Sequence, residues 1–242
     1  MMDQEEEEKS AYFTIDPEAL EYLKKADPVL GKAIDAIGKV RRVIRPNLYT
    51  ALVNSIIGQQ ISTKAQQTIW NRLEDKLGEV TPENILSLSD EEVQSIGISF
   101  RKVSYIKQVS KEIVQGDLDL NELQTMSDDE VTQRLSQIKG VGVWTAEMLM
   151  IFSMGREDIL SWDDLAIHRG LRMLYHHRRI TKKLFAKYKR RYSPYSSIAS
   201  LYLWEIAGGA VSDMKDYAPL TEAQKKRRAR SRRHTKSVDP KR

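Results

Sequence analysis

The sequence contains no cysteine among its 242 residues and only four histidines. The first absence excludes disulfide bonds, thiol catalysis and cysteine-ligated zinc or iron–sulfur clusters. With so few histidines as well, we expect no metal site. No apolar run approaches the roughly 18 residues of a membrane span, and the acidic start MMDQEEEEK is unlike a secretory leader. We therefore expect an intracellular protein, cytoplasmic in a prokaryote and nuclear in a eukaryote.

The formal net charge of +5 is unevenly distributed. Residues 221–242 hold ten Lys/Arg against two Asp/Glu, a net of +8, which leaves about −3 for the rest of the chain. This basic tail has almost no apolar residues, a composition typical of disordered segments. Such a tail binds nucleic acid through counterion release or acts as a nuclear address, and a solubilising terminus is the alternative.

Patterns typical of β-sheet are also lacking, because no stretch alternates apolar and polar residues between hairpin turns. Apolar residues instead recur at helical spacing, as at Leu48, Leu52 and Ile56. Capping residues precede acidic first turns, and glycines follow the helical stretches. The predicted starts are at Thr81, Ser89 and Ser127, and the predicted stops are at Gly78, Gly97, Gly116 and Gly140.

These signals predict an all-α protein of about ten helices. We expect a domain over residues 15–219, with a disordered acidic N-terminus at 1–14 and the disordered basic tail at 220–242.

The stretch "IKGVGVWTAEMLM" places a glycine hairpin, residues 139–142, between two expected helices at 127–138 and 143–154. Glycine permits positive φ and close approach of the backbone to a partner, and free amides at a helix N-terminus attract an anion. A hairpin of this kind suits a contact with DNA phosphates that ignores base sequence. On these residues alone, an ordinary inter-helix turn is the alternative. The residues assigned to this contact are Lys139, Gly140, Val141, Gly142 and Thr145.

Four stretches in order carry a resemblance to a known family: "ALVNSIIGQQIS", "GISFRKVSYIKQVSKEI", "IKGVGVWTAEMLM" and "WDDLAIHRGL". A fifth, "YLWEIAGG", follows them. Over residues 48–209 the chain resembles the helix-hairpin-helix base-excision DNA glycosylases, in the alkyladenine branch that includes DNA-3-methyladenine glycosylase II. The resemblance implies two packed helical subdomains, without the additional β domain of longer bacterial relatives. It also implies a monomer that removes alkylated purines from double-stranded DNA after extruding the base.

The resemblance places the catalytic aspartate at Asp164, in Trp162-Asp163-Asp164. The alternative is that either acid only caps the following helix. We expect one acid to project into the pocket while the other caps, with Asp163 as the structural partner, and shared roles for the pair are the alternative. A carboxylate near the anomeric carbon stabilises the positive charge that develops on the sugar, or orients the attacking water. At Ser161 the sequence departs from the family, in which proline is common.

Tryptophan occupies the position at which bifunctional relatives carry a nucleophilic lysine, two residues after the second hairpin glycine. Because Trp144 cannot form a Schiff base, the resemblance implies a monofunctional enzyme without lyase activity. An aromatic face also holds a cationic base. We therefore assign Trp144, Trp204 and Met148 to the pocket, together with Asp163, and ordinary core packing is the alternative for the tryptophans and Met148.

The turn "IIGQQIS" corresponds to the family's wedge, the side chain that fills the gap left by an extruded base. Gln60 matches this position and Gln59 and Ile61 flank it, although a plain helix-to-helix turn explains the same residues. The resemblance requires no cofactor, and it implies a place for a structural monovalent cation at the hairpin carbonyls. A second hypothesis is a non-catalytic DNA-binding protein on the same scaffold. Retention of Asp164 with Trp144 favours the enzyme.

Overall fold

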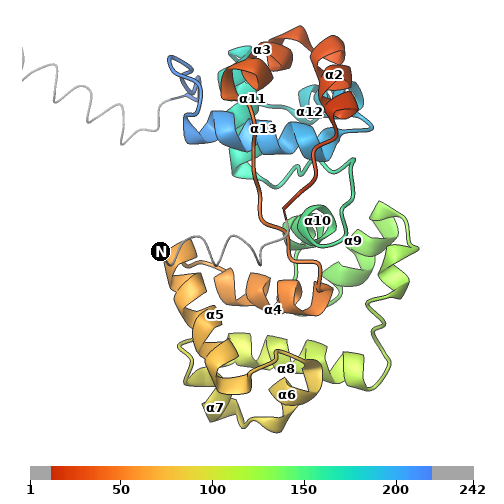
Figure 1. The fold of residues 1–242 in the computed structure, drawn as a ribbon, viewed down its shortest axis with the longest axis vertical. Helices are drawn as coiled ribbons and strands as arrows, with labels where there is room; N and C mark the ends of the chain where they lie inside the picture. Colours follow the sequence, from red (N-terminus) through yellow and green to blue (C-terminus); the bar gives the residue numbers. More distant parts are fainter. Residues whose placement is uncertain (1–11, 220–242) are drawn as a thin grey trace, which may run out of the picture.

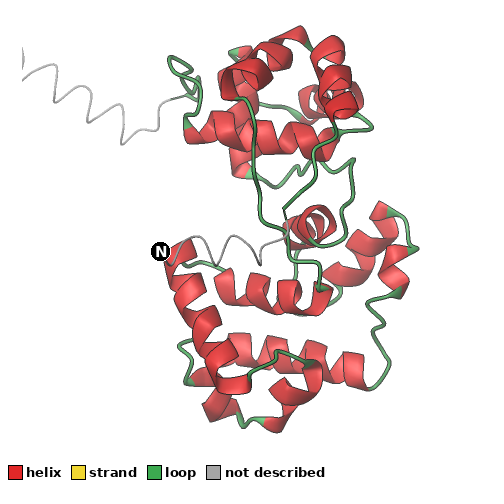
Figure 2. Ribbon diagram, viewed as in Figure 1, coloured by secondary structure: helices red, strands yellow, loops and turns green. Residues whose placement is uncertain are grey.

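The computed structural model describes residues 12–219, and within this range it contains twelve α-helices, one 3-10 turn and no strand (Figure 2). The prediction of an all-α fold is confirmed. Residues 12–14, assigned from sequence to the N-terminal tail, contact the domain, since Tyr12 forms an isolated bridge with Val43. The rest of that tail and the basic tail at 220–242 lie outside the described residues. None of the helices between residues 12 and 219 has the length and apolar character needed to span a bilayer.

The helices follow one another along the chain, and long loops connect the two parts of the molecule (Figure 1). Their bounds are α2 Pro17–Ala26, α3 Pro28–Ile37, α4 Leu48–Gly58, α5 Thr63–Leu77, α6 Pro82–Ser87, α7 Asp90–Gln94, α8 Phe100–Val114, the 3-10 turn η1 Glu122–Gln124, α9 Asp128–Ser136, α10 Val143–Phe152, α11 Leu165–Tyr175, α12 Lys182–Tyr192 and α13 Ser196–Gly208.

The predicted helix boundaries arise from local chemistry. Thr81 accepts a hydrogen bond from the amide of Asn84 at 3.2 Å and so caps α6. Ser89 and Ser127 form capping boxes at α7 and α9, in which a glutamate three residues later returns a bond to the cap amide. The four predicted stop glycines all have positive φ, between 71° and 110°. The starts are confirmed; Gly78 is the C-cap of α5, whereas α7, α8 and α9 end two to four residues before Gly97, Gly116 and Gly140.

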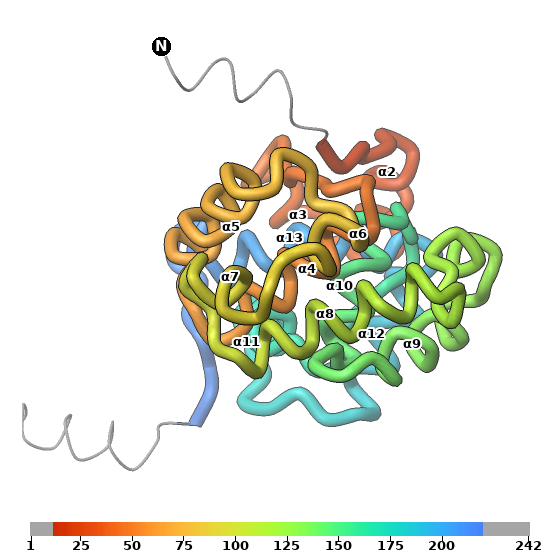
Figure 3. Tube along the Cα trace, turned by 90° about the horizontal axis from the view of Figure 1, so that it is seen from below, coloured from red at the N-terminus to blue at the C-terminus, as the bar shows by residue number. Residues whose placement is uncertain are grey.

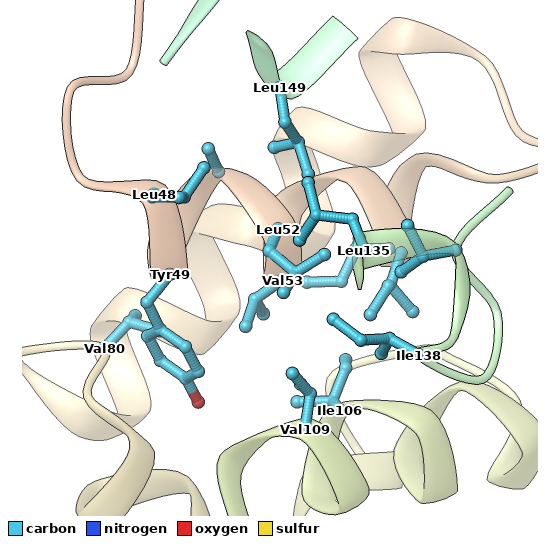
Figure 4. Close-up of a cluster of buried hydrophobic side chains, with 14 of the residues drawn as sticks. Leu48, Tyr49, Leu52, Val53, Val80, Ile106, Val109, Leu135, Ile138 and Leu149 are labelled. Carbon is cyan, nitrogen blue, oxygen red and sulfur yellow. The ribbon is translucent and has the colours of Figure 1, made fainter. Parts of the chain in front are cut away.

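The helices form two lobes with separate cores (Figure 1). The lower lobe is built from residues 48–159, helices α4 to α10. The upper lobe combines the N-terminal helices α2 and α3 with α11, α12 and α13. Viewed from below, the lower lobe lies in front of the upper lobe (Figure 3). In the lower core, side chains of α4, α8, α9 and α10 point toward one another (Figure 4).

Three aromatic residues join the lobes, because Phe13, Phe152 and Trp204 pack against both cores. The ring of Trp204 stacks on that of Phe152 with a centroid distance of 5.6 Å. The candidate site lies at this junction, so its geometry depends on how the lobes meet.

A buried carboxylate fixes the packing of the upper lobe. Asp27 is 1% exposed, and its Oδ1 caps α3 by accepting hydrogen bonds from the amides of Val29 and Leu30. Its Oδ2 accepts from the hydroxyl of Tyr175 at 2.7 Å and from the guanidinium of Arg191 at 2.6 Å. Burial acts to raise the pKa of Asp27, but these hydrogen bonds outweigh it and hold the pKa below its ordinary value. One side chain thus ties α3, α11 and α12 together.

Candidate active site and DNA-binding hairpin

Asp164 is the N-cap of α11 and is only 6% exposed. Its Oδ1 accepts hydrogen bonds from the amides of Ala166 at 2.7 Å and Ile167 at 2.9 Å. Asp163 is exposed and makes no cap bond. The expectation that Asp163 caps while Asp164 projects is therefore wrong. The residue directly before the first helical residue occupies the cap. Asp164 therefore caps α11 with one oxygen and leaves the other for the site.

The second oxygen of Asp164 receives two indole N–H groups. Trp144 Nε1, at the start of α10, donates to Oδ2 at 2.9 Å, and Trp204 Nε1, on α13, donates to the same atom at 3.2 Å. Four N–H donors thus converge on one carboxylate, an arrangement that suits an acceptor-only anion. The structure brings together three residues that sequence analysis assigned to the site, from three helices and both lobes.

The two tryptophans differ in exposure. Trp144 is 45% exposed, so a large part of its ring faces solvent beside the carboxylate. Trp204 is half-buried between the cores and serves the packing as well as the site. Met148 packs against the lower core, which agrees with the alternative that it is a core residue. Of the two tryptophans, Trp144 therefore offers the larger aromatic surface to a ligand.

Glu147 was missed by sequence analysis. It is half-buried, one turn after Trp144 on α10, and accepts a hydrogen bond from the hydroxyl of the buried Ser161. Burial raises the pKa of Glu147, the Ser161 bond opposes this, and the nearby charge of Asp163 adds to it. The 144–164 and 147–161 hydrogen bonds form two rungs between α10 and the segment that carries Asp164. The serine found where the family favours proline was the available signal.

The hairpin has the backbone geometry expected from its glycines. Gly140 has φ +88°, and a Cβ there would lie 2.3 Å from the ring of Tyr105, so a side chain does not fit. Gly142 caps α10 without a side-chain partner, and nothing lies within 4 Å of the place where its Cβ would be. Within residues 12–219, the amides that open α10 have no acceptor. They are available to an anion.

The side chains of the hairpin are less available than its backbone. Val141 and Thr145 are buried, at 4% and 6% exposed, whereas Lys139 is exposed. Any phosphate contact assigned to Val141 or Thr145 would therefore come from the backbone amide. Lys139 is the hairpin residue with an exposed positive charge.

The predicted wedge turn lies against this hairpin. Gln59 Nε2 donates to the carbonyl of Gly140 at 2.6 Å, which engages the Gln59 side chain and removes it from the wedge candidates. Gln60 is exposed at the tip with φ 60°, the left-handed region that non-glycine residues seldom adopt. Ile61 is 38% exposed. Lys102 Nζ donates to the carbonyls of Ile57 and Gln59, which holds the turn in place.

The hairpin carbonyls fit the implied cation only in part. The carbonyl of Gly140 accepts from Gln59, and that of Ile138 accepts from the amide of Val141 at 3.0 Å. Within the described part of the chain, no group of three or more His, Cys, Asp or Glu side chains is placed to hold a metal ion.

Trp144, which donates to Asp164, is 45% exposed, and the chain neighbours of this hydrogen-bonded pair, Val143 and Leu165, are 43% and 84% exposed. Exposed apolar groups that gather at one place mark binding surfaces. Leu165 was missed by sequence analysis, although its place directly after Asp164 was the signal. A cavity of about 690 Å³ lies elsewhere, between residues 12–15, α2, α3 and Tyr202, and contains none of the site residues.

Residues 53–194 match the HhH-GPD superfamily of base excision DNA repair proteins, more than half of the chain and a range that includes the hairpin and Asp164. The chain belongs to this superfamily. HhH-GPD relatives extend the match beyond that range. DNA-3-methyladenine glycosylase 1 of Schizosaccharomyces pombe is 30% identical over 227 residues, which cover 90% of this chain and 97% of the relative.

Two solved HhH-GPD structures share the fold over most of their length. The DNA-3-methyladenine glycosidase of Bacillus halodurans has a TM-score of 0.76 and 36% identity, and the match covers 86% of this chain and 97% of that one. The Schizosaccharomyces pombe 3-methyladenine DNA glycosylase, solved with abasic DNA, has a TM-score of 0.70 and 30% identity, covering 82% and 100%. The HhH-GPD match ends before Trp204. This residue is assigned to the site because its indole donates a hydrogen bond to Asp164.

Proposed function

We propose that this HhH-GPD protein is a monofunctional DNA glycosylase that hydrolyses the N-glycosidic bond of alkylated purines in duplex DNA. The substrates are chiefly 3-methyladenine, with 7-methylguanine as a second, and the product is an abasic site. The observation that carries the proposal is the buried Asp164 carboxylate, held by two indole N–H groups beside a hairpin with open amides. Relatives named DNA-3-methyladenine glycosylase support the substrate class.

The chemistry requires little beyond that carboxylate. The bond between C1′ and the purine nitrogen breaks, positive charge develops on the sugar, and the negative charge of Asp164 stabilises it. N-alkylation makes the base cationic, so it takes the bonding electrons and leaves neutral without a general acid. Water then adds to C1′ and loses its proton to solvent. The exposed ring of Trp144 offers the cationic base an aromatic face, worth about 0.5–2 kcal/mol.

DNA binding and base extrusion are assigned to the loops beside the site. The open amides of the hairpin and Lys139 bind phosphates, and Gln60 at the tip of its turn fills the space that the extruded base leaves. The direct test is incubation with randomly methylated DNA and identification of the released bases by chromatography. A non-catalytic DNA-binding protein would bind the same duplex and release none.

We expect no covalent enzyme–DNA adduct during base release. The indole of Trp144 cannot form an imine with the sugar, so borohydride trapping under conditions of excision is expected to yield only free protein. Strand breaks are expected only after alkali or heat has opened the abasic site. Efficient trapping that disappears in Lys139→Ala would contradict both the monofunctional assignment and the phosphate-binding role of Lys139.

The Glu147–Ser161 rung is expected to position Asp164. Glu147→Ala removes the acceptor, and the single-turnover rate of base release should fall about tenfold to a hundredfold, because small misplacements of a catalytic group are costly. Glu147→Gln keeps an oxygen for Ser161 and should stay near the wild-type rate. Affinity for abasic DNA should change little in either variant. Equal losses in both variants would show that the charge of Glu147 acts, rather than its hydrogen bond.

A further inference from the structure

Helix α12 and the loop before it form a strongly basic surface. Residues 178–191 contain eight Lys/Arg and no Asp/Glu. Arg191 is turned inward to Asp27, and the other seven cations are exposed. We call these seven the α12 surface: Arg178, Arg179, Lys182, Lys183, Lys187, Lys189 and Arg190.

Carboxylates within residues 12–219 do not neutralise this surface. Among residues 12–219, none of the seven forms an ion pair, whereas Lys107, Arg172 and Arg191 each contact a carboxylate within 2.7 Å. The pKa of His177 is lowered by burial and also by the positive charge of Lys187, as a concentration of like charge predicts. Uncompensated cations repel one another, and an anionic partner relieves that repulsion.

Two interactions place the α12 surface beside the active site. Lys182 Nζ lies 5.9 Å from the ring centroid of Trp162, two residues before Asp164. At the other end of the helix, the charge of Lys189 acts on the carboxyl of Glu147, the rung next to Trp144. The helix therefore runs past the segment that carries the catalytic acid, on the upper lobe (Figure 1).

The composition of the surface favours a polyanion over a membrane. Among the large apolar residues of α12, Phe185, Tyr188 and Tyr192 are buried in the upper core, and Leu184 is half-buried against it. A helix that lies in a bilayer interface needs an exposed apolar face beside its cations, and α12 has none. A row of cations without apolar partners suits the regular phosphates of a nucleic acid backbone.

We propose that the α12 surface is a second phosphate-binding surface for the DNA duplex on which the enzyme acts, a proposal that rests on the function above. The hairpin binds the backbone from the lower lobe, and the α12 surface binds it from the upper lobe. The nucleotide being processed lies between the two, where Asp164 and the tryptophans meet. Phosphate contacts from both lobes hold the sugar of this nucleotide at the carboxylate.

The test compares two variants of the full-length protein with four charges removed from each. In the first, Arg178, Arg179, Lys183 and Lys187 become glutamine, which spares Lys182 and Lys189 beside the site. In the matched control, the exposed Lys25, Lys32, Lys39 and Lys76 become glutamine. The probe is a duplex with a tetrahydrofuran abasic analogue, and its association constant is measured across a range of salt concentrations.

The α12 variant is expected to bind about 10- to 100-fold more weakly at low salt. Its slope of log K against log salt should be shallower by about two to three, since each lost phosphate contact removes about 0.9. It should also need at least tenfold more enzyme to reach half-maximal excision of methylated bases. The control should match wild type in the slope, and thermal unfolding should show both variants folded.

Equal slopes in the α12 variant and the control would overturn the proposal, because the four cations would then act only through net charge. The wild type separates this failure from failure of the proposed function. If wild type binds the abasic duplex and releases methylated bases while the α12 variant keeps its slope, the glycosylase stands and the second surface is wrong. If wild type releases no base, the glycosylase itself is wrong.

Discussion

Replacing Asp164 with asparagine is expected to lower the single-turnover rate of base release by about 1,000-fold, because it removes the charge that faces the developing sugar cation. The fold should survive with a loss of about 1–2 kcal/mol in free energy of unfolding. The single amide oxygen of asparagine can accept either from the backbone amides of α11 or from the indoles of Trp144 and Trp204. Its NH2 group then faces the remaining donors, which lose their acceptor. Single-turnover excision and urea unfolding measure the two effects.

Asp163→Asn is the matched control for charge. Its side chain is exposed and makes no cap bond, so excision and stability should change little. Affinity of Asp164→Asn for an abasic duplex should remain close to that of wild type, since the hairpin amides are untouched. Greater sensitivity of Asp163 than of Asp164 would shift the catalytic assignment by one residue.

Asp27→Ala is expected to lower the free energy of unfolding by about 3–5 kcal/mol, the range for breaking a buried ion pair from one side. The substitution leaves Arg191 without its carboxylate, removes one of the two hydrogen-bond partners of the Tyr175 hydroxyl and removes the cap of α3. Urea unfolding measures the loss. Asp35→Ala is the control, because its ion pair with Lys24 is exposed to solvent and should contribute little to the free energy of unfolding. Similar losses in the two variants would contradict the assignment.

The same residue makes the fold sensitive to acid. Since the pKa of Asp27 is held below its ordinary value in the folded state, its contribution is complete above the ordinary value of about 4 and is lost as pH falls through the lower folded value. Between about pH 5 and 2, the free energy of unfolding should therefore decrease less steeply with falling pH for Asp27→Ala than for wild type.

The sequence was sufficient to predict helix caps, which depend on neighbouring residues, and site residues that stand in motifs of a fixed order. The caps at Ser89 and Ser127 are local, and Asp164 and Trp144 stand at recognisable positions in ordered stretches. Sequence did not predict which contacts packing would create. The Tyr175–Asp27 bond spans 148 residues, and the Glu147–Ser161 bond requires a loop to fold back on a helix. The Asp163 error has the same origin, because the cap depends on where α11 begins.

The upper lobe draws on both ends of the domain, with α2 and α3 before the lower lobe and α11 to α13 after it. During synthesis, all of the lower lobe leaves the ribosome before the last upper helix is made. The apolar faces of α2 and α3, including Leu23 and Leu30, are therefore not fully buried until α11 and α13 have been synthesised. Apolar surface that is exposed during synthesis is where a nascent chain aggregates or binds a chaperone. The last partner of Asp164 to be made is Trp204, so the complete site forms only when α13 has joined the fold.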